Sequence, residues 1–259
     1  MGILNVTPDS FSDGGEFFEP ERAVARARQI IAEGADILDI GGESSRPGAE
    51  PVSAEEELRR VTPVIEQIAC WRSPVTISID TTKAAVAERA LAAGARIVND
   101  ISALRFDERM AEVVREAGAG VVLMHMQGTP RTMQIEPRYR DVVAEVRNFL
   151  AERIAFAESR GIKKSQIAID PGIGFGKTVE HNVMLLARLR AFCELGCPVL
   201  VGASRKSFIG KWLGREPKDR LAGSLAVAAW AVMSGARIVR VHDVAETVDA
   251  VRMIEAIQQ

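Results

Sequence analysis

Residues 75–100 read VTISIDTTKAAVAERALAAGARIVND and hold one complete unit of strand, helix and strand. The apolar run at 75–79 is followed by a segment of helical period at 83–93, which stops at Gly94 before a second apolar run at 97–98. Glycine directly after a helix is a common stop, because it adopts the left-handed backbone without steric cost. The stretch therefore predicts two parallel strands joined by a helix.

The same unit repeats in both directions along the chain. Eight short apolar runs occur, at 3–4, 37–40, 75–79, 97–98, 121–124, 167–169, 199–201 and 238–241. They alternate with eight segments of helical period, at 21–32, 54–69, 83–93, 108–117, 141–160, 181–194, 219–234 and 244–257. The length of 259 residues suits an α/β barrel, which typically uses about 250. We expect a single (β/α)8 TIM barrel that spans residues 1–259 as one domain. An open doubly wound sheet is the alternative, because periodicity alone does not show closure.

Composition excludes several classes of function. The net charge is −2, from 33 Lys and Arg against 35 Asp and Glu, whereas nucleic-acid and membrane-surface proteins usually carry a basic excess or a basic amphipathic segment. No apolar run approaches the roughly 18–20 residues that span a bilayer, and a signal peptide is not evident. The three cysteines, Cys70, Cys193 and Cys197, are too few for a disulfide framework. We expect a cytoplasmic protein that binds neither nucleic acid nor membrane.

Polar residues lie at or beyond the C-terminal end of each of the eight apolar runs. These residues are Asn5, the segment 41–48, Asp80, Asn99, His125, Asp170, Lys206 and Arg240. In a (β/α)8 barrel the active site lies at the C-terminal ends of the strands, so the set predicts one site for a polar ligand. Carboxylates and amides follow strands three, four and six, and cations follow strands seven and eight. This sorting suits a heterocycle that donates hydrogen bonds at one end and carries phosphate at the other.

Each of these residues taken singly has a simpler interpretation. A buried ion pair, such as Asp170 with Lys206, or a cap on a strand end would explain one residue but not the whole set. His125 is expected to be a hydrogen-bonded residue of the rim rather than a catalyst. Two long loops, at 6–20 and 41–52, are candidates for closing over substrate.

Two segments are similar to the signatures of a known family. Residues 1–15, MGILNVTPDSFSDGG, and 39–49, DIGGESSRPGA, resemble those of the dihydropteroate synthases. Further segments fall in the family's order, at 78–81, 98–100, 123–128, 170–177, 204–207 and 240–243. The resemblance covers the whole chain. It implies a transferase of folate biosynthesis, a target of sulfonamides, that condenses 6-hydroxymethyl-7,8-dihydropterin diphosphate with p-aminobenzoate. It further implies Mg2+ as cofactor and a homodimer.

The resemblance also implies roles for individual residues. The pterin-binding set is Asp80, Asn99, Met124, Asp170, Phe175, Gly202 and Lys206. The diphosphate-binding set is Asn5, Arg240 and His242, with Asn5 as the metal ligand. The p-aminobenzoate-binding set is Phe11, Ser45, Arg46, Pro47, Lys206 and Ser207. The catalytic set is Lys206, Arg240, Asp80 and Asp170.

The implied chemistry is a dissociative substitution in which the bond to diphosphate breaks before the arylamine attacks. Mg2+ and the cations suit the charge that develops on the leaving group. Two other functions stay open on the sequence. One is a pterin-binding methyltransferase domain, which would need no diphosphate anchor, and the other is a barrel that binds pterin without turnover.

Overall fold

The structure is a computed structural model that describes residues 1–7, 20–45, 48–71 and 73–258. Its strands are β1 (Gly2–Asn5), β2 (Ile37–Gly41), β3 (Thr76–Asp80), β4 (Ile97–Asp100), β5 (Gly120–Met124), β6 (Ile167–Asp170), β7 (Leu200–Val201) and β8 (Ile238–Val239). Its α-helices are α2 (Pro20–Ala32), α3 (Ala54–Ala69), α4 (Ala84–Ala93), α5 (Met110–Ala117), α6 (Val142–Ser159), α7 (Val179–Ala187), α8 (Arg190–Cys193), α9 (Ser207–Leu213), α10 (Leu221–Met233) and α11 (Val244–Gln258).

The strands close into a barrel in chain order. Strands β1 to β6 form one parallel sheet, and β7 pairs with β8. Single-residue parallel bridges join the two parts, from Ile169 to Val199 and from Gly2 to Val241. The last seam carries hydrogen bonds in both directions, since Ile3 N donates to Val241 O at 3.0 Å and Val241 N donates to Met1 O at 3.0 Å. The expected (β/α)8 barrel is confirmed, and the open sheet is wrong.

Alternate residues of each strand face the helices and the barrel interior. On β2, Leu38 and Ile40 belong to the main apolar cluster, on which the helices pack. Successive side chains point to opposite faces of a strand, so Asp39 between them points into the barrel. The same alternation on β3 turns Ser78 and Asp80 inward. The pleat thus carries polar side chains through the barrel interior to the C-terminal rim.

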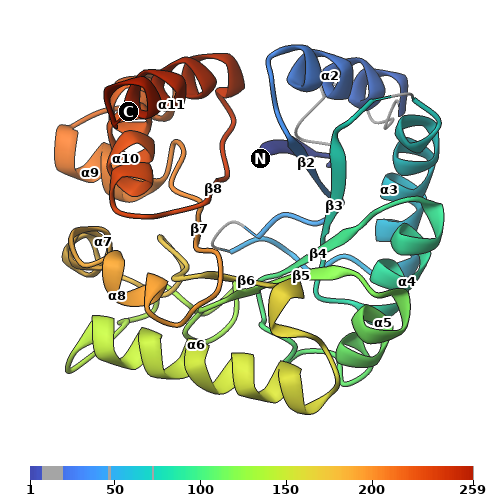
Figure 1. The fold of residues 1–259 in the computed structure, drawn as a ribbon, viewed down its shortest axis with the longest axis horizontal. Coiled ribbons are helices and arrows are strands. Elements are labelled where there is room, and N and C mark those ends of the chain that lie inside the picture. The colour runs from blue at the N-terminus through green and yellow to red at the C-terminus, as the bar shows by residue number, and fades with distance from the viewer. Residues whose placement is uncertain (8–19, 46–47, 72, 259) are drawn as a thin grey trace.

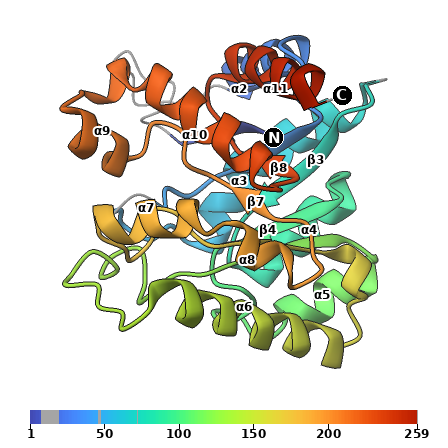
Figure 2. The same ribbon diagram turned by 60° about the vertical axis from the view of Figure 1, so that its left-hand side comes forward.

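The helices surround the strands, as the two views show (Figures 1 and 2). Local capping explains several of their ends. Ser53 Oγ accepts the Glu56 N–H at the start of α3, at 3.1 Å, as its N-cap position predicts. Gly118 closes α5 in the left-handed region, at φ 61°. Among the described residues, none of the helices is long and apolar enough to cross a bilayer.

Two helical segments differ from the prediction. The segment 181–194 is divided into α7 and α8, and near the break Leu186 O accepts both the indole N–H of Trp230 at 2.8 Å and the Leu189 N–H at 3.4 Å. Helix α9 was not predicted from the sequence. A Cβ at Gly210 would lie 2.3 Å from Nη2 of Arg220. A larger residue at this position would therefore displace the guanidinium of Arg220.

Candidate active site

Acidic and basic side chains meet at the C-terminal rim of the barrel. The guanidinium of Arg240, just after β8, donates from Nη2 to Oδ2 of Asp80 at 2.7 Å. Asp80 stands beside Asn99 in the register of β3 and β4. A Cβ at Gly202, just after β7, would lie 3.7 Å from Cβ of Arg240 and 3.9 Å from Oδ2 of Asp170. Residues from β3, β4, β6, β7 and β8 therefore border one space, and the glycine keeps it open between Arg240 and Asp170.

Arg240 is already paired with carboxylates, contrary to the expected separation of anions and cations around the rim. Its Nε donates to Oδ2 of Asp39 at 2.5 Å, and its Nη2 binds Asp80. Burial acts to lower the pKa of Arg240, but the charges of Asp39 and Asp80 raise it overall. The guanidinium is therefore permanently charged and is held in place from two sides.

Asp39 was not among the predicted site residues. Its side chain is fully buried, and its Oδ2 also accepts the Nδ2 amide hydrogen of Asn99 at 2.9 Å. A signal was present in the sequence, because a charged residue at an inward position of an otherwise apolar strand rarely serves packing alone.

Asp80 and Lys206 have pKa values near neutrality. Burial raises the pKa of Asp80 to about 7, against the lowering effect of Arg240, and the charge of Asp39 raises it further. Burial lowers the pKa of Lys206 to about 8, against the raising effect of Asp170. Both groups can therefore change their charge within one unit or so of neutral pH, which is typical of functional sites.

Asp170 and Lys206 face the same space without a direct ion pair among the described contacts. Oδ1 of Asp170 accepts the Gly172 N–H at 2.7 Å, and burial raises the pKa of this carboxyl group. The ammonium of Lys206 donates to the carbonyl of Ile173 and lies 4.4 Å from the ring centroid of Phe175. The other oxygen of Asp170, Oδ2, lies beside Gly202 and faces the space between them.

An apolar wall borders the site. Met124 and Phe175, both predicted to line the pterin pocket, pack in a small cluster separate from the main core. Its other members are Ile101, Met126 and Met133. A flat heterocycle could lie against this wall while its polar edge meets the carboxylates.

A buried lysine supports the loop that follows β6. Nζ of Lys177 lies 2.9 Å from Nδ1 of His125 and donates to the carbonyl of Phe175 at 2.8 Å. Burial, and secondarily the charge of Lys177, lower the pKa of His125 to about 2. His125 is a hydrogen-bonded residue at the strand end, and Lys177 was not predicted to take part in the site.

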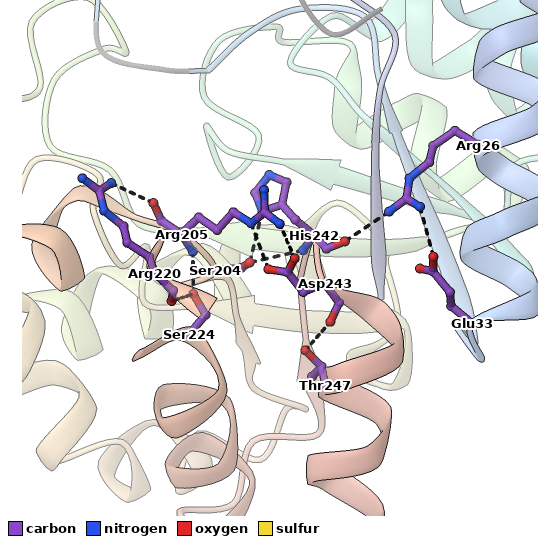
Figure 3. A network of polar contacts seen from close by, with 9 residues as sticks. All are labelled: Arg26, Glu33, Ser204, Arg205, Arg220, Ser224, His242, Asp243 and Thr247. Carbon is purple, nitrogen blue, oxygen red and sulfur yellow. Dashed lines mark hydrogen bonds and ion pairs between the residues drawn. The ribbon is translucent and has the colours of Figure 1, made fainter. Parts of the chain in front are cut away.

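A second polar network holds the loops after β7 and β8 (Figure 3). His242 Nδ1 lies 3.1 Å from Oγ of Ser204. Arg205 is paired through Nε and Nη2 with Asp243. Arg26 of α2 donates to the backbone carbonyl of His242 at 3.3 Å and so ties the first helix to the last loop.

The remaining predicted residues differ in how far they are described. Asn5 is half-buried at the end of β1, Ser45 is half-buried after β2, and Ser207 is exposed at the start of α9. Phe11, Arg46 and Pro47 lie outside the described residues, as does most of the loop at 6–20.

Comparisons with known proteins agree with one another over most of the chain. The model of a family described as pterin binding enzymes matches residues 1–242. The chain is 54% identical to a dihydropteroate synthase of Escherichia coli (strain K12), over 99% of this chain and 90% of that protein. It is similar to the structure of Xanthomonas albilineans dihydropteroate synthase with 4-aminobenzoic acid, with a TM-score of 0.94 and 53% identity over 100% of this chain and 92% of that one. Yersinia pestis dihydropteroate synthase with a sulfonamide drug gives a TM-score of 0.94 and 47% identity, over 100% and 93%.

Proposed function

The chain belongs to the pterin binding enzymes and, within them, to the dihydropteroate synthases. From this premise we propose which residues of the rim bind each part of the two substrates. The enzyme condenses 6-hydroxymethyl-7,8-dihydropterin diphosphate with p-aminobenzoate and releases 7,8-dihydropteroate and diphosphate. The observation that carries the assignment of residues is the convergence of Asp80, Asn99, Asp170, Lys206 and Arg240 on one space.

The pterin ring is assigned to the acidic side of this space. The ring edge presents N–H donors, and the carboxylates of Asp80 and Asp170 with the amide of Asn99 offer acceptors. Lys206 supplies a donor to the ring's acceptor atoms. Met124 and Phe175 would cover a face of the ring.

The diphosphate is assigned to Arg240 and His242. Two nitrogens of the Arg240 guanidinium are engaged by carboxylates, and Nη1 makes no hydrogen bond within the described part of the chain. Its two N–H donors are suited to phosphate oxygens. The partial neutralisation of Arg240 would keep product diphosphate from binding too tightly.

Asn5 is proposed to contribute to a Mg2+ site. The described residues contain no cluster of three or more His, Cys, Asp or Glu side chains that could bind a metal by themselves. Mg2+ often takes only one or two protein oxygens and fills its shell with water and substrate phosphates. A single amide oxygen fits an ion that arrives with the diphosphate. When bound, Mg2+ would neutralise charge on the leaving group.

The residues suit a substitution at the pterin methylene carbon. The C–O bond breaks, and its electron pair leaves with diphosphate beside Arg240. The resulting cation is stabilised by the ionised Asp80 and Asp170, and the arylamine nitrogen then forms the C–N bond and releases a proton. The p-aminobenzoate would bind near Lys206, Ser207 and Ser45, together with Phe11, Arg46 and Pro47 of the long loops. The relatives with 4-aminobenzoic acid and a sulfonamide support such a site.

A product assay tests this proposal. The protein is incubated with pterin diphosphate and p-aminobenzoate, with Mg2+ or with EDTA, and both dihydropteroate and diphosphate are measured. We expect both products in equal amounts, dependent on Mg2+. Methyl transfer from a folate without diphosphate release would support the methyltransferase, and pterin binding without condensation would support the silent barrel.

A homodimer is proposed from an apolar surface. Helices α7, α9, α10 and α11, of which neighbouring members contact one another, carry exposed apolar residues. These residues are Val183, Met184, Trp212, Leu213, Trp230, Met233, Met253 and Ile257. Adjacent exposed apolar side chains of this number mark interaction sites more often than free surface. We expect Met233→Asp to convert a dimer to a monomer in light scattering, and Ile135→Asp, at an exposed loop residue, to leave the mass unchanged.

The extent of the domain and the location of the protein are proposed from the same premise. We propose that residues 1–259 act as one pterin-binding domain, which is supported by a continuous apolar cluster from Leu4 to Val244. A cytoplasmic location is proposed as well, supported by the three cysteines, all of them free.

A further inference from the structure

Asp39 lies inside the barrel beneath the rim, and the proposed function assigns it no role. Its side chain is fully buried, whereas the side chains of Arg240 and Asp80 remain 19% and 14% exposed. A single oxygen, Oδ2, accepts hydrogen bonds from both Arg240 and Asn99. A substrate in the space above would therefore meet Arg240 and Asn99 but would not reach the carboxylate that holds them.

We propose that Asp39 is a positioning residue for the synthase reaction, which fixes the guanidinium of Arg240 and the amide of Asn99 relative to each other through one carboxylate oxygen. The inference rests on the proposed function, because it assigns the two held groups to the two ends of the pterin diphosphate. Arg240 follows β8 and Asn99 lies on β4, and a shared contact with Asp39 would keep the two groups at a fixed distance, so that they bind the diphosphate end and the ring end of one substrate together.

The first consequence concerns the orientation of the Asn99 amide. An ionised carboxylate only accepts hydrogen bonds, so Asn99 must turn Nδ2 toward Asp39. Its Oδ1 is then directed away from Asp39 and is available to an N–H of the ring. Without a carboxylate at position 39, the two ends of the amide would no longer be distinguished.

The second consequence concerns the plane of the guanidinium. Asp39 binds Arg240 at Nε and Asp80 binds it at Nη2. Two acceptors on different nitrogens fix both the place and the tilt of a planar group. With only Asp80 left, the guanidinium could turn about one hydrogen bond, and Nη1 would lose its fixed direction toward the diphosphate.

Burial argues that Asp39 is retained for function rather than for stability. Its Oδ1 is buried and has no hydrogen-bond partner among the described residues. Buried carboxylates are costly unless fully paired, and the interior positions of such barrels are dominated by branched apolar residues. An apolar residue at position 39 would cost less free energy to bury. The role of the carboxylate is therefore explained by the two groups that it orients, Arg240 and Asn99.

The test compares Asp39→Asn with Ser78→Ala in the synthase assay. Ser78 is paired with Asp39 in the register of β2 and β3, is also buried, and has no hydrogen-bond partner for its hydroxyl among the described residues. We expect Asp39→Asn to lower kcat/KM for pterin diphosphate by roughly 10- to 100-fold, by analogy with the loss of hydrogen-bond partners that orient metal ligands. The KM for p-aminobenzoate should stay within about twofold, and Ser78→Ala should match the wild type.

The pH profile supplies a readout that a loss of packing would not change. Asp80 is faced by Asp39, Glu57 and Asp100, which oppose its ionisation, and by Arg240 and Lys206, which favour it. These groups come from β2, α3, β4 and the loops after β8 and β7. Removing the negative charge of Asp39 should move the acidic limb of kcat/KM to lower pH. Asp39→Glu keeps the charge but displaces it, so this variant should lose rate without moving the limb.

The outcomes separate the two proposals. Wild-type protein that forms no dihydropteroate overturns the proposed function and this inference with it. An active wild type with kcat/KM unchanged in Asp39→Asn overturns the inference alone, as does a lower rate with an unmoved acidic limb. If Asp39→Asn does not fold, wild-type kinetics in Asp39→Glu would overturn it equally.

Discussion

Replacing Asp80 with Asn should stabilise the protein without ligand at pH 8 while it impairs pterin binding. Burial raises the pKa of Asp80 from 3.8 to about 7. Well below pH 4 this carboxyl group is protonated in both the folded and the unfolded chain, so it contributes no pH-dependent term. As pH rises from 4 to 7 the unfolded chain ionises first, and folding stability falls by about 1.4 kcal/mol per unit.

The magnitude follows from the width of that window. Three units correspond to about 4 kcal/mol at most, and part of this is offset because the neutral amide of the variant would bind Arg240 less strongly than the carboxylate does. We expect a net gain of about 2 kcal/mol at pH 8. For a protein of this size about 1 kcal/mol shifts the Tm by roughly 2–4 °C, so the Tm should rise by about 4–8 °C.

Thermal unfolding of both proteins at pH 5 and pH 8, in the same ionic strength and without ligand, provides the measurement. The difference in Tm should be large at pH 8 and shrink at pH 5. An equal difference at both pH values, or a lower Tm of the variant at pH 8, would refute the reasoning that burial disfavours the ionised form of Asp80 and so lowers the stability of the folded protein.

Two further predictions concern the framework of the site. Gly172→Ala should strongly reduce the yield of folded protein, because φ is +70° and a Cβ would lie 1.9 Å from a backbone carbonyl oxygen. Gly118→Ala is the control, with φ +61° and no atom within 4 Å of the added Cβ. It should lower the free energy of unfolding, measured by chemical denaturation, by only about 1–2 kcal/mol. Lys83→Met should destabilise by about 3–5 kcal/mol, because it leaves the fully buried carboxylate of Glu57 without its partner at 2.6 Å. Arg89→Met, at an exposed ion pair, should change the unfolding free energy by less than about 1 kcal/mol, and equal effects of the two substitutions would contradict this account.

The order of elements could be predicted from the sequence because its signals are local. Period-2 and helical apolar patterns, and glycines such as Gly94 and Gly118, act within a few residues of themselves. The same signals placed Asp80, Asn99 and Asp170 at strand ends. The prediction was wrong for the segment 181–194, which is divided into α7 and α8 near the point where Trp230, 44 residues further along the chain, donates to Leu186 O.

Tertiary structure alone decided which charges meet. Arg240 is bound by carboxylates that precede it by 201 and 160 residues, at Asp39 and Asp80. No periodic pattern reports such a pairing, since it exists only once the last strand has closed on the first. Electrostatic energies in a buried space depend on distances of a few ångströms between these groups. The sequence therefore determined which side chains reach the rim. Closure of the barrel determined which of these side chains pair with one another and which stay available to a ligand.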